Sequence, residues 1–291
     1  MRRTWAMLLP TALIAATLIA TGEGTATAAT KATYYLSLGD SLAVGCQPIG
    51  PPFCGGNLGY PDQLYRAIHA SMPDLRLVRR ACDGESTGSM ITAVGSTCTY
   101  LTGSQLNAAV AFIQAHPGEM AFVTIDVGAN DVLRPDMGAC FDPETGVLSE
   151  SCVQAVLPSA QANLATILQT LRAALDQAGD PSAPIIGMNY YDPFLGFAAI
   201  LGPPGETLAG LDNQAVLALN TGLEATYTDA VVPFTDVAAA FDIESYPSVQ
   251  SVENTCNWTW FCAPPPLGPD IHPNADGYGV IAAAFEELLP H

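Results

Sequence analysis

Basic residues are scarce in this chain of 291 residues, which has 9 lysines and arginines against 28 acidic residues. Lys31 is the only lysine, and the formal net charge is −19. Such a field repels polyanions, so we expect neither nucleic acid nor an anionic lipid surface as a partner. Charged residues make up only 13 % of the chain, against roughly 25 % in an average soluble domain. The composition therefore favours a neutral or weakly charged substrate.

Common nucleotide- and metal-binding motifs are also missing. The chain has no G-x-G-x-x-G and no G-x-x-x-x-G-K-[ST] segment, which excludes the usual glycine-rich turns for dinucleotides and nucleoside triphosphates. It has no C-x-x-C pair, and no cysteine lies near a histidine at the spacing of zinc ligands. We therefore predict neither a cofactor nor a metal.

Long apolar runs are absent except at the N-terminus. There, the arginines at 2–3 precede an apolar run over 5–20, and small residues follow at 26–28. This pattern is typical of a secretory signal peptide, and the run is short for a membrane span. We expect residues 1–28 to be a cleaved signal peptide and residues 29–291 to form one secreted domain without stable membrane insertion. The alternative is an uncleaved membrane anchor.

Eight cysteines follow this export signal, so disulfides are their default state. Eight cysteines allow 105 pairings, and their order along the chain suggests four local ones. The predicted pairs are Cys46 with Cys54, Cys82 with Cys98, Cys140 with Cys152, and Cys256 with Cys262. Each would close a loop and stabilise the fold by about 2–3 kcal/mol.

Short apolar segments alternate with amphipathic ones along the chain. The predicted strands are 34–38, 75–81, 120–127, 185–190 and 231–234. The predicted helices are one that opens at residues 60–62 and ends before residue 73, then 104–116, 158–178, 207–227 and 275–289. Segment 134–152 is expected to be a loop, and 192–205 a loop or short helix. This alternation predicts an α/β fold of three layers, with a mostly parallel, flavodoxin-like sheet of five strands and helices on both faces.

The first predicted strand ends at the sequence Gly39-Asp40-Ser41-Leu42. In open α/β sheets, ligands bind beyond the carboxyl ends of the strands. A serine in this turn is therefore placed to meet a ligand. The alternative is an ordinary turn in which Asp40 or Ser41 caps the next helix.

A serine nucleophile needs a base, and histidine is the usual one. His69 and His116 belong to predicted helices, and His291 is the last residue. His272 lies in a proline-rich loop before the last predicted helix. Elimination therefore leaves His272 as the candidate base, and a structural histidine in a capped loop is the alternative.

Four segments together resemble a known family. Gly39-Asp40-Ser41-Leu42, Gly84, Gly128-Ala129-Asn130-Asp131 and His272-Pro273 are similar, in this order, to the four blocks of the SGNH or GDSL esterases and lipases. The resemblance implies the SGNH hydrolase fold, with Ser41 as the nucleophile and His272 as the base. It also implies an oxyanion hole made by the backbone N–H groups of Ser41 and Gly84 and the side-chain amide of Asn130.

The third member of a catalytic triad is less clear from the sequence. Members of this family usually carry an aspartate three residues before the histidine, and here that residue is Pro269. Asp270, two residues before His272, is the candidate. A backbone carbonyl that orients the imidazole is the alternative. We expect Asp40 and Asp131 to hold their loops by hydrogen bonds rather than to act as acids.

We predict a secreted, monomeric serine hydrolase that cleaves carboxylic esters, either small molecules or lipids, through an acyl-enzyme on Ser41. The apolar residues of 194–201, with Trp258, Trp260 and Phe261, are candidates for an acyl pocket, and core packing is the alternative. Two other functions stay open. One is an acetylesterase that acts on acetylated polysaccharide, and the other is a non-catalytic binder of the cell envelope that keeps the fold.

Overall fold

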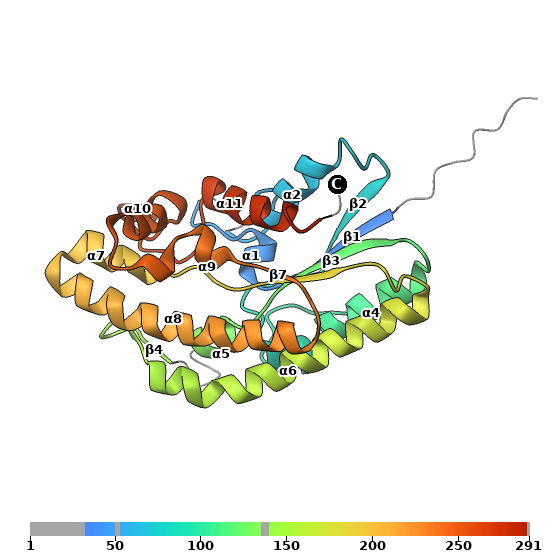
Figure 1. The fold of residues 1–291 in the computed structure, drawn as a ribbon, viewed down its shortest axis with the longest axis horizontal. Coiled ribbons are helices and arrows are strands. Elements are labelled where there is room, and N and C mark those ends of the chain that lie inside the picture. Colours follow the sequence, from blue (N-terminus) through green and yellow to red (C-terminus); the bar gives the residue numbers. More distant parts are fainter. Residues whose placement is uncertain (1–32, 50–52, 135–139, 290–291) are drawn as a thin grey trace, which may run out of the picture. The chain divides into compact units, whose positions relative to one another are not determined.

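Five parallel strands form the central sheet of the computed structural model, which describes residues 33–49, 53–134 and 140–289 (Figure 1). The strands lie in the order β2-β1-β3-β6-β7, and every neighbouring pair is parallel. This is the 2-1-3-4-5 order of flavodoxin-like sheets. The predicted fold class is confirmed. The strands are β1 (Thr33–Gly39), β2 (Leu75–Arg79), β3 (Met120–Asp126), β6 (Ile185–Met188) and β7 (Phe234–Thr235).

Helices cover both faces of this sheet (Figure 1). On one face, α2 (Tyr60–Ile68) packs against α11 (Ala275–Glu286). On the other, α4 (Gln105–Ala115), α6 (Glu150–Ala178) and α8 (Pro203–Asp229) pack side by side. The interior strands β1 and β3 are buried on both faces, which explains their continuous apolar runs.

Shorter elements complete the described chain, and most of them lie beyond the carboxyl ends of the strands. The helices are α1 (Ser41–Val44), α3 (Thr87–Thr92), α5 (Asn130–Leu133), α7 (Gly196–Leu201), α9 (Val237–Ala240) and α10 (Val249–Trp258). Two 3₁₀ turns, η2 (Pro193–Leu195) and η3 (Ile243–Ser245), and one hairpin, β4 (Phe141–Asp142) with β5 (Val147–Leu148), are also present.

Helix α6 shows where reading proline as a helix start was wrong. The predicted helix began at Pro158, but the observed one begins eight residues earlier, at Glu150. Ser149 caps it, because its hydroxyl accepts a hydrogen bond from the N–H of Cys152. Pro158 lies inside the helix. Part of the expected loop over 134–152 is therefore helix and part is the β4–β5 hairpin.

Other elements also differ from the predictions. Helix α8 extends further at both ends than the predicted 207–227. The last strand, predicted over 231–234, begins only at Phe234, because Val231 adopts a left-handed conformation with φ of +55° and turns the chain after α8. Helix α10 was not predicted at all. Ser248 caps it by accepting a hydrogen bond from the N–H of Ser251.

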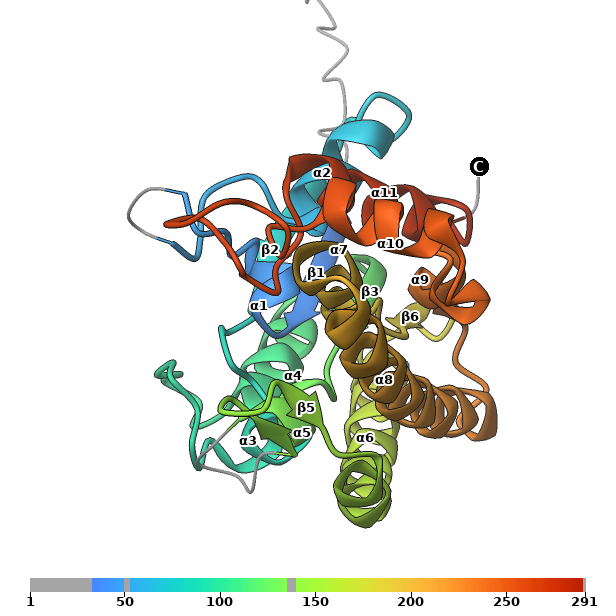
Figure 2. The same ribbon diagram turned by 90° about the vertical axis from the view of Figure 1, so that its left-hand side faces the viewer.

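The strand order reverses between β1 and β3, and this places a crevice at the carboxyl ends of these strands. Ser41 follows β1, and Asn130 follows β3. Figure 2 views this edge of the sheet, with α1, α5 and the β4–β5 hairpin toward the viewer. The topology therefore brings two of the predicted site residues to one place.

All four predicted disulfides are present. Each closes a local loop, and no described cysteine is free. Within the described ranges, no helix is long and apolar enough to span a membrane. The predicted signal peptide lies outside the described residues.

Candidate active site

Ser41 is the first residue of α1, directly after the turn that ends β1. Asp40 caps this short helix, because its Oδ1 accepts a hydrogen bond of 3.0 Å from the N–H of Leu42. The N–H groups of a first helical turn have no partner within the helix, so the N–H of Ser41 can meet a ligand. The helix cap and the ligand-facing serine are therefore compatible, because Asp40 caps the helix while Ser41 lines a pocket.

His272 and Asp270 form a hydrogen-bonded pair in the loop before α11. The Nδ1 of His272 lies 2.9 Å from Oδ1 of Asp270, and the N–H of His272 donates to the same oxygen over 2.9 Å. Burial by itself would raise the pKa of Asp270, but its hydrogen bonds with His272 and the charge of that ring lower it. Asp270 therefore stays ionised and can hold the imidazole with Nδ1–H toward itself and Nε2 toward Ser41.

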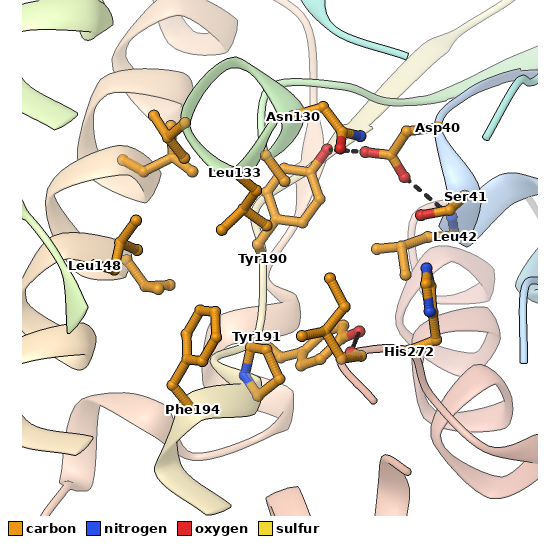
Figure 3. A pocket seen from close by; sticks show the side chains of 16 residues that line it. Asp40, Ser41, Leu42, Asn130, Leu133, Leu148, Tyr190, Tyr191, Phe194 and His272 are labelled. Carbon is orange, nitrogen blue, oxygen red and sulfur yellow. Dashed lines mark hydrogen bonds between the residues drawn. The ribbon is translucent and has the colours of Figure 1, made fainter. Parts of the chain in front are cut away.

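Contacts with neighbouring segments hold the His272 loop. The backbone N–H of Trp260 donates to the carbonyl of His272 over 3.0 Å, and the hydroxyl of Tyr191 donates to the carbonyl of Ile271 over 2.7 Å. In Figure 3, the imidazole of His272 extends toward Ser41 at one end of the pocket. Ser41, His272 and Asn130 all line this pocket.

Asn130 and Gly84 lie on neighbouring loops. The Nδ2 of Asn130 donates a hydrogen bond of 3.1 Å to the carbonyl of Glu85, the residue after Gly84. A side-chain amide carries two N–H donors, so this bond leaves one for a ligand. Gly84 has a φ of +72°, which a glycine adopts without strain, and it is not itself among the residues that line the pocket. The structure thus places Gly84 beside Asn130, one residue from its bonding partner.

Two buried carboxyl groups lie beneath Ser41, and sequence reasoning missed one of them. Asp126, at the end of β3, accepts hydrogen bonds from the hydroxyl of Tyr60 over 2.6 Å and from the N–H of Ala43 over 3.3 Å. Asp40 accepts one from the hydroxyl of Tyr190 over 3.0 Å. Burial raises the pKa of both carboxyl groups, and the charge of Asp40 raises that of Asp126 further. Burial therefore favours the protonated form of both carboxyl groups.

Asp131 also binds a loop, as expected. Its two oxygens accept hydrogen bonds from the N–H of Thr87 over 2.9 Å and from the hydroxyl of Thr87 over 2.6 Å. This ties α5, which carries Asn130, to the start of α3. Burial raises the pKa of Asp131. Asp131 is thus a structural partner of the site.

Ser86 lies in a second serine motif and is a possible alternative to Ser41 as the nucleophile. Residues 84–88 read Gly-Glu-Ser-Thr-Gly, which matches the G-x-S-x-G spacing of another hydrolase class. That motif requires its serine on a sharp turn directly after a strand, with an exposed hydroxyl. Ser86 is instead fully buried, and it caps α3 through hydrogen bonds with Ser89. The structure therefore gives Ser86 the role of a helix cap.

The pocket at Ser41 is mainly apolar. Beyond the polar end, its wall is made by aliphatic and aromatic side chains from the segments after β1, β3 and β6, from β5, from α8 and from the loop before α11 (Figure 3). The apolar lining residues are Leu42, Ala129, Val132, Leu133, Leu148, Tyr190, Tyr191, Pro193, Phe194, Val216, Leu219 and Ile271. The space can therefore take an apolar group next to Ser41 and His272.

The predicted acyl-pocket residues are only partly at this pocket. Phe194 lines it, but Trp258, Trp260 and Phe261 do not. Phe261 packs edge-on against Phe194 and Phe197, with ring centroids 5.9 Å and 4.9 Å apart, and so supports the wall from behind. The α8 and hairpin residues that complete the wall carry no sequence signal, because their side chains reach the site only through packing.

Potential metal ligands gather at one place in the described ranges. Cys46, Cys54 and Asp83 lie close together, but the two sulfurs are joined in a disulfide. Only one carboxylate is left there to bind an ion, which is too few ligands for a protein metal site.

Comparison with known proteins agrees with this geometry. A model of the GDSL-like lipase/acylhydrolase family matches residues 37–280 of the chain. No curated protein matches it significantly.

Solved structures share the fold at low sequence identity. The extracellular lipase of Streptomyces rimosus matches with a TM-score of 0.52 and 21 % identity, over 88 % of this chain and 99 % of that one. Phospholipase A1 of Streptomyces albidoflavus matches with a TM-score of 0.50 and 20 % identity, over 88 % and 99 %. An acetylxylan esterase of Geobacillus stearothermophilus matches with a TM-score of 0.50 and 16 % identity, over 90 % and 96 %.

Proposed function

Because the chain belongs to the GDSL-like lipase/acylhydrolase family and is a carboxylic ester hydrolase, we propose that it works through an acyl-enzyme on Ser41. The hydrogen bond between Asp270 and Nδ1 of His272 supports this, since it leaves Nε2 as a base for the serine hydroxyl. Ser41 Oγ attacks the ester carbonyl while Nε2 takes its proton. The N–H groups of Ser41 and Gly84 and the amide of Asn130 then stabilise the tetrahedral oxyanion.

The second half of the reaction uses the same groups. In the collapse of the first intermediate, the imidazolium gives its proton to the alcohol oxygen as the ester C–O bond breaks, and the oxyanion becomes the carbonyl of the acyl-enzyme. A water molecule then gives a proton to His272 and attacks the acyl carbon. The bond between the acyl carbon and Ser41 Oγ then breaks, the imidazolium returns its proton to Oγ, and the carboxylic acid leaves.

We infer that the acyl group is an apolar chain longer than acetyl. The apolar wall beside Ser41 is the observation that carries this inference. An acetyl group would leave most of that wall without a partner. Each methylene moved from water into such a pocket contributes about 0.8 kcal/mol, or roughly a fourfold gain in kcat/KM, until the space is full.

A panel of p-nitrophenyl esters with acyl chains of two to twelve carbons, together with acetylated xylan, tests this specificity. We expect kcat/KM to rise with chain length from acetyl to a medium chain, and acetate release from xylan to be slow. The reverse order would favour the acetylesterase function. Replacing Leu148, whose side chain lines the wall, by Trp should shorten the preferred chain.

Labelling with a fluorophosphonate tests the nucleophile. The folded wild-type protein should be labelled once, and Ser41→Ala should lose both the label and about 10⁶-fold in kcat. An unlabelled but folded wild type would favour the non-catalytic binder of the cell envelope. A label that survives Ser41→Ala would contradict the assignment of Ser41.

We also propose that the protein is exported as a monomer. Its four disulfides and its N-terminal pattern support export, since disulfides persist in oxidising compartments. Protein secreted by an expression host should begin near Ala29 when its N-terminus is sequenced. Light scattering of that protein would test the monomer.

A further inference from the structure

Gln105, the first residue of α4, places its whole side-chain amide in hydrogen bonds inside the protein. Its Oε1 accepts from the N–H of Gly39 over 2.7 Å, and its Nε2 donates to the carbonyl of Gly39 and to Oε2 of Glu85, both over 3.0 Å. The residue is fully buried and does not line the pocket. Gln105 therefore links Gly39, at the end of β1, to Glu85 in the loop before α3.

Gly39, the first of these partners, sets the position of Ser41. It is the last residue of β1 and stands two residues before the serine. A side chain here would collide with Asp126, since an added Cβ would lie 2.2 Å from its Oδ1. Gln105 bonds both the N–H and the carbonyl of Gly39, as a neighbouring strand would. The backbone N–H of Cys82 also donates to this carbonyl over 3.0 Å, so the distinct contribution of the amide is the hydrogen bond that its Oε1 accepts from the N–H of Gly39.

Glu85, the second partner, sets the positions of Gly84 and Asn130. Its carboxylate is fully buried and also accepts hydrogen bonds from the hydroxyls of Ser89 and Ser96. Its backbone carbonyl accepts the hydrogen bond of Asn130 Nδ2. One residue therefore adjoins Gly84 in the chain, holds Asn130 and is itself held by Gln105.

We propose that Gln105 is a positioning residue that fixes the three oxyanion donors relative to one another. It binds the loop of Ser41 through Gly39, and the loops of Gly84 and Asn130 through Glu85. This inference rests on the proposed function, because it assigns a role in that reaction.

The expected consequence follows from how such donors work. They act on the oxygen of the transition state, whose position differs from that of the ground-state carbonyl, so small shifts of a donor cost rate rather than substrate binding. A misplacement of about 1 Å can cost about 10²-fold. Removing the amide should therefore lower kcat and leave KM nearly unchanged.

Gln105→Met is the first test, since methionine has a similar length and cannot make these hydrogen bonds. We expect kcat to fall by about 10- to 100-fold with KM within about twofold. The inhibition constant of a trifluoromethyl ketone, which forms a tetrahedral adduct with a serine, should weaken by the same factor as kcat/KM. A loss of stability alone would not produce that match.

Gln161→Met is the matched control. Gln161 lies on α6, and its Nε2 donates to the carbonyl of Gly222 over 2.9 Å. The exchange removes a hydrogen bond between two helices, away from the pocket. It should therefore lower the melting temperature without changing kcat.

Two further variants keep the test decisive if Gln105→Met does not fold. Gln105→Glu replaces the amide donor by a second carboxyl group against the carboxylate of Glu85. Activity relative to wild type should rise as the pH falls, because a proton between the carboxyls restores a donor. Combining it with Glu85→Gln should restore the link, and hence part of kcat, at neutral pH.

The outcomes separate this inference from the proposed function. A wild type that neither hydrolyses esters nor reacts with fluorophosphonate contradicts the proposed function. An active wild type with Gln105→Met within twofold of its kcat, or with the same loss in Gln161→Met, overturns the role of Gln105 alone. So does a Gln105→Glu variant without pH-dependent recovery and without rescue by Glu85→Gln.

Discussion

The two sides of this active site are built in different ways. The side of Ser41, Gly84 and Asn130 rests on fully or nearly fully buried polar side chains, among them Asp126, Glu85 and Gln105. The side of the proposed base is a surface loop, in which the side chains of His272 and Asp270 are 18 % and 30 % exposed. Backbone hydrogen bonds and the Tyr191 hydroxyl hold that loop.

This difference matches what the proposed reaction requires of each side. Oxyanion donors must already be in place when charge develops, and buried networks keep them there at the cost of desolvating polar groups. The base must take and release a proton in each half of the reaction, and partial exposure keeps it in contact with water. The mutations below test the buried side and the exposed side separately, beginning with the largest expected effect.

Asp270→Asn should have the largest effect, on the exposed side. The amide would hold the imidazole in the wrong tautomer, so kcat should fall by about 10²- to 10⁴-fold at neutral pH while the protein stays folded. Steady-state kinetics measures this. Asp276→Asn, an exposed carboxylate in the first turn of α11, is the control and should change little. A loss below about tenfold would instead point to a backbone carbonyl as the partner of the ring.

Asn130→Ala tests the buried side directly. Losing one oxyanion donor should lower kcat by about 10²- to 10³-fold, with little change in KM. Asn163→Ala removes an amide that donates to the Thr87 hydroxyl over 3.2 Å, one step further from the site, and should cost much less. Equal losses in the two variants would mean that Asn130 only supports its loop.

Asp212→Asn tests the cost of burying a carboxyl group beside the pocket. Asp212 is fully buried on α8 and accepts a hydrogen bond of 2.6 Å from the N–H of Leu148, and burial raises its pKa from 3.8 to about 6. The folded state therefore binds this proton more tightly than the unfolded state does. The stability from Asp212 is complete below pH 4 and is lost as the pH rises through 6.

Asparagine keeps the acceptor and removes the titration, so Asp212→Asn should be more stable than wild type at pH 7, by up to about 3 kcal/mol, with the difference vanishing near pH 4. Urea unfolding at several pH values measures this. Asp142→Asn, an exposed carboxylate of the hairpin, should show no such gain. A constant difference at all pH values would contradict the raised pKa.

Removing the Cys256–Cys262 disulfide by a double exchange to Ser should have the smallest effect, about 2 kcal/mol of stability from its short loop. This loop carries Trp260, whose backbone N–H donates to the carbonyl of His272. Because a looser loop would position His272 less well, kcat should also fall a few-fold. The matched double exchange at Cys140 and Cys152 should cost similar stability without lowering kcat to the same degree. Unfolding and kinetics on both variants distinguish the two roles.

Much of the fold and the chemistry was readable from the sequence, because local patterns encode it. Buried parallel strands have continuous apolar runs, and the Gly-Asp-Ser turn follows the first of them, so the sheet and the position of Ser41 could be predicted. Helix starts were less certain, since Pro158 looked like a first turn and lies inside α6. Elimination among the four histidines selected His272, and the resemblance supplied the possible roles of Gly84 and Asn130.

What only the tertiary structure decided depends on pairs that are far apart in the chain. Gln105 is 66 residues from Gly39 and 20 from Glu85, and Leu148 and Asp212 are 64 residues apart. No periodicity marks such residues, because their roles arise from side-chain contacts that exist only after the strands and helices have packed. The sequence alone determined a parallel sheet with a serine at its carboxyl edge; packing decided what holds that serine and what wall it faces.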